Sequence, residues 1–484
     1  FDRYPNLAGG FVWDFVDQAV RRRTPEGDRW LYGGDFGEEV GDGNFCADGI
    51  VAADRTPHPA YYEVKKAYQP VRVRAVDLSG GVVRVENRGA FSDLSGFEML
   101  WQVTEDGRPV AQRRMEPPPA GPGESREVRL GFRTTDFRRD AECFLTVFFL
   151  ARNATPWCRK GYPAAFEQFQ LAPPAFRPEP EEDRPLRLEV TPEAYLVSGE
   201  GFRAAVSRRS GDLVSLDYGF GELLRAPMRP NYWRALTDND RGYANFSPRW
   251  EKLLTWPSMR WRGATEKRRV RGVSAERRGN RAVVTVEQRV PHCRGRAETV
   301  WEVDGGGNVF LRHSILPKGS MMRLGFTFGL PRALRNVTWY GRGPHENYCD
   351  RKTGAPVGVY SLPAERLGHA YLRPQENGAR TDVRWVEAVD GEGNGLRVSA
   401  KRPFGFSVWP YTQADLERAE HGFELPERDF LTVNADAAQR GVGGDQPGIA
   451  HVHEAYRLPK GRALVLELVF SKAGPRRAAE NRRT

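Results

Sequence analysis

The stretch GGFVWDFVDQ, Gly9 to Gln18, is a short apolar run that ends on a tryptophan and then turns acidic. Such runs are typical of parallel strands that are buried on both faces. Trp13 ends the run, and Asp14 and Asp17 follow it. The change from apolar to acidic residues indicates the carboxyl end of a strand, which in a βα barrel is the end that carries the active site.

The residues that follow supply only one further regular element. A turn-rich stretch leads to a predicted helix at about Pro59 to Tyr68, with Tyr61, Val64 and Ala67 on one face. One strand and one helix make a single βα unit, which cannot bury both faces of a parallel strand. We therefore expect residues 1–68 to be the last unit of a larger α/β domain whose earlier part is missing.

Alternation of apolar and polar residues begins at Val71 and is typical of half-buried strands. A hairpin signal follows at Glu105 to Gly107, and Glu142 to Leu150 is a run of core type. About a hundred residues of this pattern predict an immunoglobulin-like β-sandwich over residues 69–172.

Beyond this sandwich the composition changes twice. Residues 173–185 are rich in Pro and Glu and are predicted to be a linker. Residues 186–473 again show many strands with tight turns, including a hairpin at Asp304 to Asn308, and predict a large C-terminal β-sandwich. Residues 474–484 are expected to form a basic tail.

The overall composition favours a turn-rich, mainly β, multidomain protein. Of the 484 residues, 39% are hydrophobic, and 51 Gly and 35 Pro are present. The formal net charge is +10, with basic runs at Arg21 to Arg23, Lys267 to Arg269 and Arg476 to Arg483. No helix-turn-helix, zinc-finger or single-strand-binding pattern accompanies these runs, so nucleic acid is not an expected partner.

Cysteine usage and hydropathy bear on the compartment. The five cysteines are odd in number and unclustered, which argues against a disulfide framework and against a metal-site spacing. The sequence contains no apolar run of 18 or more residues and no signal-peptide pattern at its start. These features predict a cytoplasmic protein with no membrane partner.

Four groups of motifs carry a family resemblance. They are GGFVWDFVDQ with YGGDFGE and NFCADGIV, NYWRALTDNDRG, GRGPHENYCDR, and RPQENGARTDVRW. In this order and spacing they closely resemble the C-terminal part of the long bacterial β-galactosidases of glycoside hydrolase family 2. The resemblance runs from residue 1 to about residue 473. It implies the end of a catalytic (β/α)₈ TIM barrel, an immunoglobulin-like sandwich and a galactose-mutarotase-like supersandwich.

The resemblance also assigns roles to residues of the first segment. Gly9 to Phe15 would be the eighth barrel strand, and Trp13 would form the floor of the galactose pocket; the alternative is a buried tryptophan that packs on its neighbours. The Phe45 carbonyl and the Asp48 side chain would help to hold a sodium ion that meets the galactose 6-hydroxyl. Asp48 replaces the asparagine of the best-known members, and without the resemblance Asp48-Gly49 would indicate a turn.

A second group lies near the predicted active-site mouth. By resemblance, Asp238, Asn239 and Asp240 form the root of a mobile loop that hinges at Gly242. Residue-level alternatives are turn-stabilising side chains and half of a calcium loop, although the Glu that an EF-hand requires is absent. We expect a further set of loop residues to serve internal hydrogen bonding rather than catalysis: His345, Glu346 and Glu376.

One departure from the family pattern stands near the C-terminus. The family commonly shows GVGGDDSWG, whose tryptophan stacks on incoming sugar, whereas this chain reads GVGGDQPGIA. Gly448 takes the place of that tryptophan. An aromatic sugar platform is therefore expected to be absent at this position.

Retaining glycoside hydrolysis needs two carboxylates about 5 Å apart. By resemblance, both of them, the Mg²⁺ ligands and one sodium ligand lie upstream of this sequence. We therefore predict an inactive C-terminal part of a β-galactosidase that, when complete, hydrolyses terminal non-reducing β-D-galactose residues and is a homo-oligomer. The alternatives are a non-catalytic small subunit that completes a partner chain, a galactoside-binding module, and a self-contained hydrolase that uses Asp14, Asp17 or Asp35.

Overall fold

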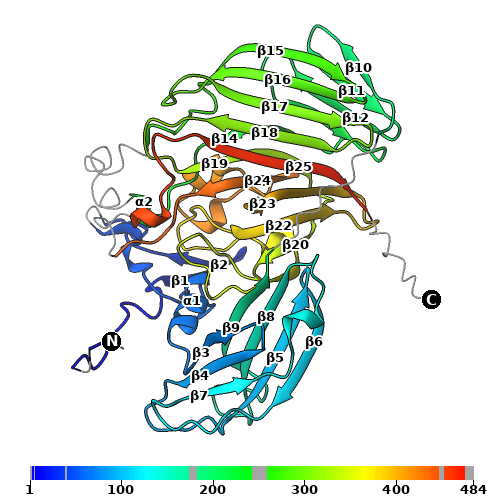
Figure 1. Cartoon of the computed structure of the whole chain (residues 1–484). Coiled ribbons are helices and arrows are strands. Elements are labelled where there is room, and N and C mark those ends of the chain that lie inside the picture. The colour runs from blue at the N-terminus through cyan, green and yellow to red at the C-terminus, as the bar shows by residue number, and fades with distance from the viewer. Residues whose placement is uncertain are drawn as a thin grey trace.

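The computed structural model describes residues 3–4, 6–38, 41–173, 183–241, 259–445 and 452–474. Strands dominate, as the sequence predicted (Figure 1). The largest sheet occupies the upper part of Figure 1, the smaller sandwich lies below it, and the N-terminal segment lies to the left, against both. The mainly β, multidomain fold class predicted from the sequence is thus confirmed.

The N-terminal segment differs from expectation in one respect. Gly9 to Phe15 forms no strand, and only Val16 makes a ladder contact, a parallel bridge to Val51. Backbone hydrogen bonds to residues 48–51 begin only at Asp14, so among the described residues Gly9 to Trp13 lack the ladder partners that a strand needs along its length. The segment instead contains a hairpin, β1 (Val20–Thr24) and β2 (Gly27–Leu31), a 3₁₀ turn (Gly43–Cys46) and helix α1.

Helix α1 (Pro59–Ala67) falls where the sequence predicted it. Proline at the first helical position suits this start, because its missing N–H would have no helical partner there. The Glu63 carboxylate accepts hydrogen bonds from the backbone N–H of Thr353 (3.1 Å) and of Gly354 (2.8 Å). A Cβ at position 354 would lie 2.6 Å from the Tyr62 carbonyl oxygen, so only glycine permits this close approach.

Two sheets form the immunoglobulin-like sandwich. One has the order β3 (Val71–Asp77), β4 (Val82–Asn87), β7 (Ser125–Arg129), and the other β6 (Arg108–Met115), β5 (Phe97–Glu105), β8 (Cys143–Ala151), β9 (Pro163–Ala172). Inward-facing side chains from both sheets form one core, for example Val83, Met99 and Phe149. The predicted hairpin turn joins β5 to β6, with Asp106 at φ 47°.

Sixteen strands of the described ranges form one antiparallel sheet system in the large sandwich. Its main path runs β10 (Arg187–Val190), β11 (Ala194–Gly199), β12 (Phe202–Ser207), β13 (Leu213–Asp217), β14 (Ala226–Asn231), β19 (Arg323–Pro331), β24 (Phe430–Gln439), β23 (Gly395–Trp409), β25 (Leu464–Ala473), β18 (Val309–Ile315), β17 (Ala297–Asp304), β16 (Arg281–Arg289), β15 (Arg269–Arg278). The strands off this path are β20 (Asn336–Arg342), β21 (Val357–Pro363) and β22 (Arg380–Val389).

Strand β23 crosses the large sandwich and contributes to its main hydrophobic core. Its 15 residues pair with β22, β24 and β25, so one long strand joins the two halves of the sheet system. The core contains large side chains that are fully or almost fully buried, among them Trp301, Trp339 and Phe326. The predicted hairpin at Asp304 joins β17 to β18.

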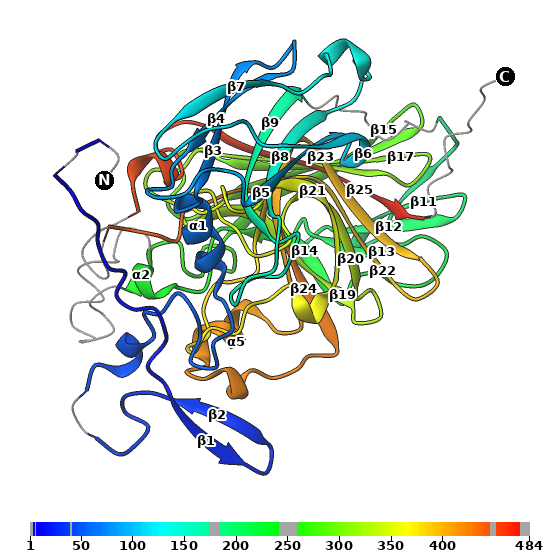
Figure 2. The same ribbon diagram turned by 90° about the horizontal axis from the view of Figure 1, so that it is seen from below.

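Short helical elements occur in the loops of the large sandwich and in one loop of the smaller sandwich. They are α2 (Asp238–Arg241), α5 (Gln413–Arg418) and 3₁₀ turns at Thr134–Asp136, Ala364–Arg366, Gly422–Glu424 and Glu454–Tyr456. Figure 2 shows the β1–β2 hairpin extending from the body of the molecule on the side of α5. The hairpin is held there by the Tyr32 hydroxyl, which donates to the Glu420 carbonyl oxygen at 2.6 Å.

Several sequence-based expectations concern features that are partly or wholly outside the described residues. Gly242, Gly448, most of the linker (174–182) and the tail from 475 onward are among them. All five cysteines are described and none forms a disulfide. None of the helices in the described ranges combines the length and the apolar character that a bilayer crossing requires.

Candidate functional site

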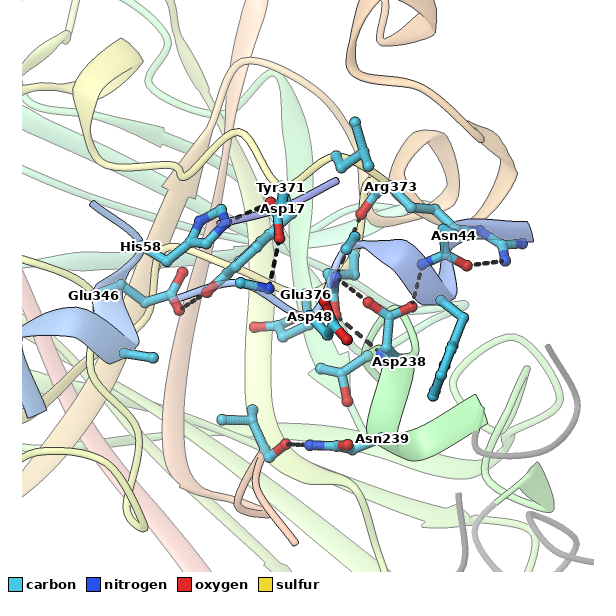
Figure 3. Close-up of a pocket in the computed structure, with 18 of the residues that line it drawn as sticks. Asp17, Asn44, Asp48, His58, Asp238, Asn239, Glu346, Tyr371, Arg373 and Glu376 are labelled. Carbon is cyan, nitrogen blue, oxygen red and sulfur yellow. Dashed lines mark hydrogen bonds and ion pairs between the residues drawn. The ribbon is translucent and has the colours of Figure 1, made fainter. Parts of the chain in front are cut away.

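A cavity of about 330 Å³ lies between the N-terminal segment and the large sandwich. Trp13, Asn44, Phe45 and Asp48 line it from the N-terminal segment, and loops of the large sandwich complete it. Figure 3 labels Asn44 and Asp48 beside residues of these loops. The sandwich contributes several polar side chains: Asp238, Asn239, Glu346, Tyr371, Arg373 and Glu376. Cavities between structural units are common ligand sites.

Trp13 presents its indole to solvent at this cavity. The side chain is 80% exposed, so the alternative of a buried tryptophan that packs on its neighbours does not describe this structure. Phe45, on the same cavity, is 46% exposed. An indole face held open in this way can pack on the apolar C–H face of a sugar. The sequence predicted this residue, and the structure places it where a ligand could reach it.

Asp48 has an unused oxygen at the cavity wall. Its Oδ1 atom is buried and makes no hydrogen bond to any described residue. Burial raises the pKa of this carboxyl above its ordinary value. A lone carboxylate oxygen of this kind is a suitable donor for a hard cation. The described ranges contain no group of three or more His, Cys, Asp or Glu that could hold a metal ion, so Asp48 would be one ligand among carbonyl or external oxygens.

Asp238 and Asp240, the two acidic residues of α2, make different contacts. Asp238 accepts hydrogen bonds from the Asn44 side chain (2.9 Å) and the Gln375 side chain (2.8 Å), which links the N-terminal segment to the large sandwich. Asp240 instead forms a buried ion pair with Arg234 at 2.9 Å. The sequence predicted the cluster but gave no sign of its contact with Asn44.

Asn239 also lines the cavity, and its side-chain amide donates to the Val442 carbonyl oxygen at 2.8 Å. The cluster is therefore held by specific hydrogen bonds on both sides of the cavity. The hinge expected at Gly242 lies outside the described residues, so the hinge stays a prediction.

Glu346 is held by internal hydrogen bonds, as the sequence analysis expected. It accepts from the Tyr371 hydroxyl (2.7 Å) and the Gly378 backbone N–H (2.6 Å), and it pairs with Arg351. Burial acts to raise the pKa of Glu346, but the Arg351 charge and these hydrogen bonds outweigh it and hold the pKa below its ordinary value.

Glu376 and His345 are also engaged within the protein. Glu376 pairs with Arg323 at 2.8 Å, and both side chains are fully buried. The His345 ring stacks on Tyr62 of α1 at 4.3 Å between centroids, and burial lowers the pKa of this histidine to about 4. These contacts agree with a structural role for all three residues.

Sequence reasoning missed a buried polar chain at the cavity wall. Asp17 and His58 are each 5% exposed, and the His58 Nε2 atom lies 2.7 Å from Asp17 Oδ2. The His58 Nδ1 atom lies 2.7 Å from Nε2 of His369, in a loop of the large sandwich. The only local signal was the acidic residue after the apolar run. Its partners are distant in sequence.

Comparison with known families accounts for all three parts of the chain. The family model described as beta galactosidase small chain matches residues 198–470. The chain belongs to this β-galactosidase family. The model for β-galactosidase domain 4 matches residues 83–172, and that for the TIM barrel domain of family 2 glycosyl hydrolases matches residues 1–73. The resemblance found in the motifs is confirmed.

Curated relatives of this β-galactosidase chain are much longer than it is. The β-galactosidase of Priestia megaterium is 34% identical over 469 residues, which cover 96% of this chain and 44% of that protein. β-Galactosidase BgaC of Bifidobacterium adolescentis is 34% identical over 489 residues, covering 96% and 45%. The chain thus spans less than half the length of these relatives and corresponds to their C-terminal part.

Among solved structures, a galactose mutarotase related enzyme from Lactobacillus acidophilus aligns with 58% of this chain and 97% of its own. The sequence identity is 9% and the TM-score is 0.32. Values this low support no conclusion about this chain.

Proposed function

We propose that this C-terminal part of a β-galactosidase supplies one wall of a site that hydrolyses terminal non-reducing β-D-galactose residues with retention of configuration. The observation that carries the proposal is the cavity itself. It brings the exposed Trp13 indole, Phe45 and the partnerless oxygen of Asp48 together at one opening. The names of the relatives support the substrate class.

Two contacts with the sugar follow from this arrangement. The Trp13 indole packs on the C–H face of the galactose ring, which orients the anomeric carbon. The Asp48 carboxylate and the Phe45 backbone carbonyl would hold a sodium ion. When bound, sodium would supply a positive charge for the sugar 6-hydroxyl. The orphaned Asp48 oxygen supports this assignment.

The two catalytic carboxylates and the Mg²⁺ ligands are proposed to come from a barrel region outside this sequence. Most carboxylates on the described cavity wall are already committed to neighbours. Asp17 bonds His58, Glu346 pairs with Arg351, and Glu376 pairs with Arg323. A retaining nucleophile must be free to attack the anomeric carbon, and these three carboxylates are instead bonded to neighbouring side chains of the protein.

The test compares the chain alone with a reconstituted complex. The purified chain should show no turnover of nitrophenyl β-galactoside. Co-expression with the N-terminal half of the Priestia megaterium β-galactosidase, which supplies the barrel strands and carboxylates, should restore turnover. Activity of the purified chain alone that disappears when one of its own acidic residues is changed would overturn the proposal.

A second candidate is a small subunit that assembles with a separate large chain. The description of the matching family model as a small chain favours it. In this case the native protein should separate on a denaturing gel into this chain and a larger one. Size-exclusion chromatography of the intact assembly would then test the expected homo-oligomer.

A further inference from the structure

The buried chain of Asp17, His58 and His369 joins three parts of the molecule. Asp17 follows the Trp13 segment, His58 precedes helix α1, and His369 belongs to the large sandwich. When Nε2–H of His58 donates to Asp17 and Nε2–H of His369 donates to Nδ1 of His58, both contacts are hydrogen bonds. Burial lowers the pKa of His369 to about 4, which agrees with a neutral ring.

The other oxygen of Asp17 holds the backbone next to Asp48. Asp17 Oδ1 accepts from the Gly49 backbone N–H at 2.8 Å. A Cβ at Gly49 would lie 2.2 Å from the Asp17 nitrogen and 2.6 Å from the Val51 carbonyl oxygen, so the two backbones meet with no space for a side chain. Both carboxylate oxygens of Asp17 are therefore used, one on each side.

Backbone hydrogen bonds also join the segment around Asp14 to the segment around Asp48. The Asp14 N–H donates to the Asp48 carbonyl oxygen, and the Ile50 N–H donates to the Asp14 carbonyl oxygen, each at 3.1 Å. Asp48 is thus held on both sides by the segment that also carries Trp13. These hydrogen bonds hold the main chain that carries the Asp48 side chain and its oxygen without a partner.

We propose that Asp17 is a positioning residue for Asp48, and that His58 and His369 make this positioning depend on the docked large sandwich. The inference rests on the proposed sodium role of Asp48. Asp17 acts through the Gly49 backbone and touches neither sugar nor ion. The large sandwich thereby helps to position Asp48, a proposed sodium ligand that belongs to the N-terminal segment.

Hydrogen–deuterium exchange of the full-length chain tests the contact without any activity. In the peptide that covers residues 46–51, Asp17→Ala should speed exchange of the Gly49 amide at least tenfold. Asp17→Asn keeps an acceptor oxygen and should restore most of the protection. Asp54→Ala, an exposed change near the same loop, should leave exchange as in the wild type.

A variant in the large sandwich tests the coupling between the parts. His369→Ala should speed exchange in the same 46–51 peptide at least threefold, although residue 369 is more than 300 positions away. Equal exchange in wild type, Asp17→Ala and His369→Ala would overturn the inference. Faster exchange in Asp17→Ala alone would overturn the coupling to the sandwich.

The reconstituted complex tests the consequence for the ion. Asp17→Ala should raise the sodium concentration for half-maximal activity about tenfold, equivalent to 1.4 kcal/mol, while kcat at saturating sodium changes less than twofold. An unchanged sodium response together with faster exchange would refute the positioning role. If no wild-type complex is active, the proposed function fails, and the exchange measurement alone decides for or against the Asp17 contact.

Discussion

Replacement of Trp13 by alanine should lower kcat/KM in the reconstituted complex and hardly change stability. A tryptophan side chain offers up to about 250 Å² of surface, and Trp13 is 80% exposed. A sugar that covers one face removes about 100 Å² from water, which at about 25 cal/mol per Å² gives at most about 2.5 kcal/mol. Imperfect contact reduces this, so we expect a loss of roughly tenfold to a hundredfold.

The assay measures kcat/KM of Trp13→Ala and Trp13→Phe with nitrophenyl β-galactoside, beside urea unfolding of the chain alone. Phenylalanine keeps an aromatic face and should recover part of the loss. Because the side chain is exposed, the unfolding midpoint should shift little. Unchanged kinetics would refute the sugar contact. A large drop in unfolding midpoint would instead show that the indole is packed in a core.

Three further predictions concern the large sandwich and its docking. Glu376→Ala leaves Arg323 buried without this partner and should lower the free energy of unfolding by about 3 to 5 kcal/mol in urea titrations, whereas Glu276→Ala, in an exposed pair, should change it little. Burial, partly offset by Arg323, raises the pKa of Asp436 to about 7. Wild-type stability should therefore fall between about pH 4 and pH 7 relative to Asp436→Asn, measured as urea midpoints across that range. Gly354→Ala should clash with a carbonyl of helix α1 and speed hydrogen exchange in that helix.

Each of these predictions has a contradicting outcome. Equal losses for Glu376→Ala and Glu276→Ala would mean that burial of the pair does not matter. The sign of the pH effect follows from the folded state binding a proton that the unfolded chain releases, so a stability gain with rising pH relative to Asp436→Asn would contradict it. Unaltered exchange in α1 after Gly354→Ala would show that the helix docks by other contacts.

The sequence could predict elements whose cause is local. The alternation after Val71, the turn at Asp106 and the helix that starts at Pro59 depend on neighbours in sequence, and the structure contains all three. The family motifs also located Trp13 and Asp48 at what is now a cavity. Local periodicity and motif spacing were therefore enough to predict most of the fold.

The remainder depends on contacts that no local pattern encodes. An apolar run predicts a strand only if backbone partners exist along it, and among the described residues those of Gly9 to Phe15 begin only at Asp14. The contact of Asn44 with Asp238 joins residues 194 apart, and that of His58 with His369 joins residues 311 apart. A single sequence shows each of these residues as an ordinary polar position.

Docking of the N-terminal segment onto the large sandwich has a consequence for synthesis on the ribosome. Tyr32 is made 388 residues before its acceptor Glu420. At roughly 5 to 20 residues per second, the segment waits about 20 to 80 s for that surface. Throughout this interval Tyr32, which is 7% exposed in the folded chain and stacks on His421, lacks the surface that covers it. The rate of translation therefore sets how long this part of the N-terminal segment stays uncovered.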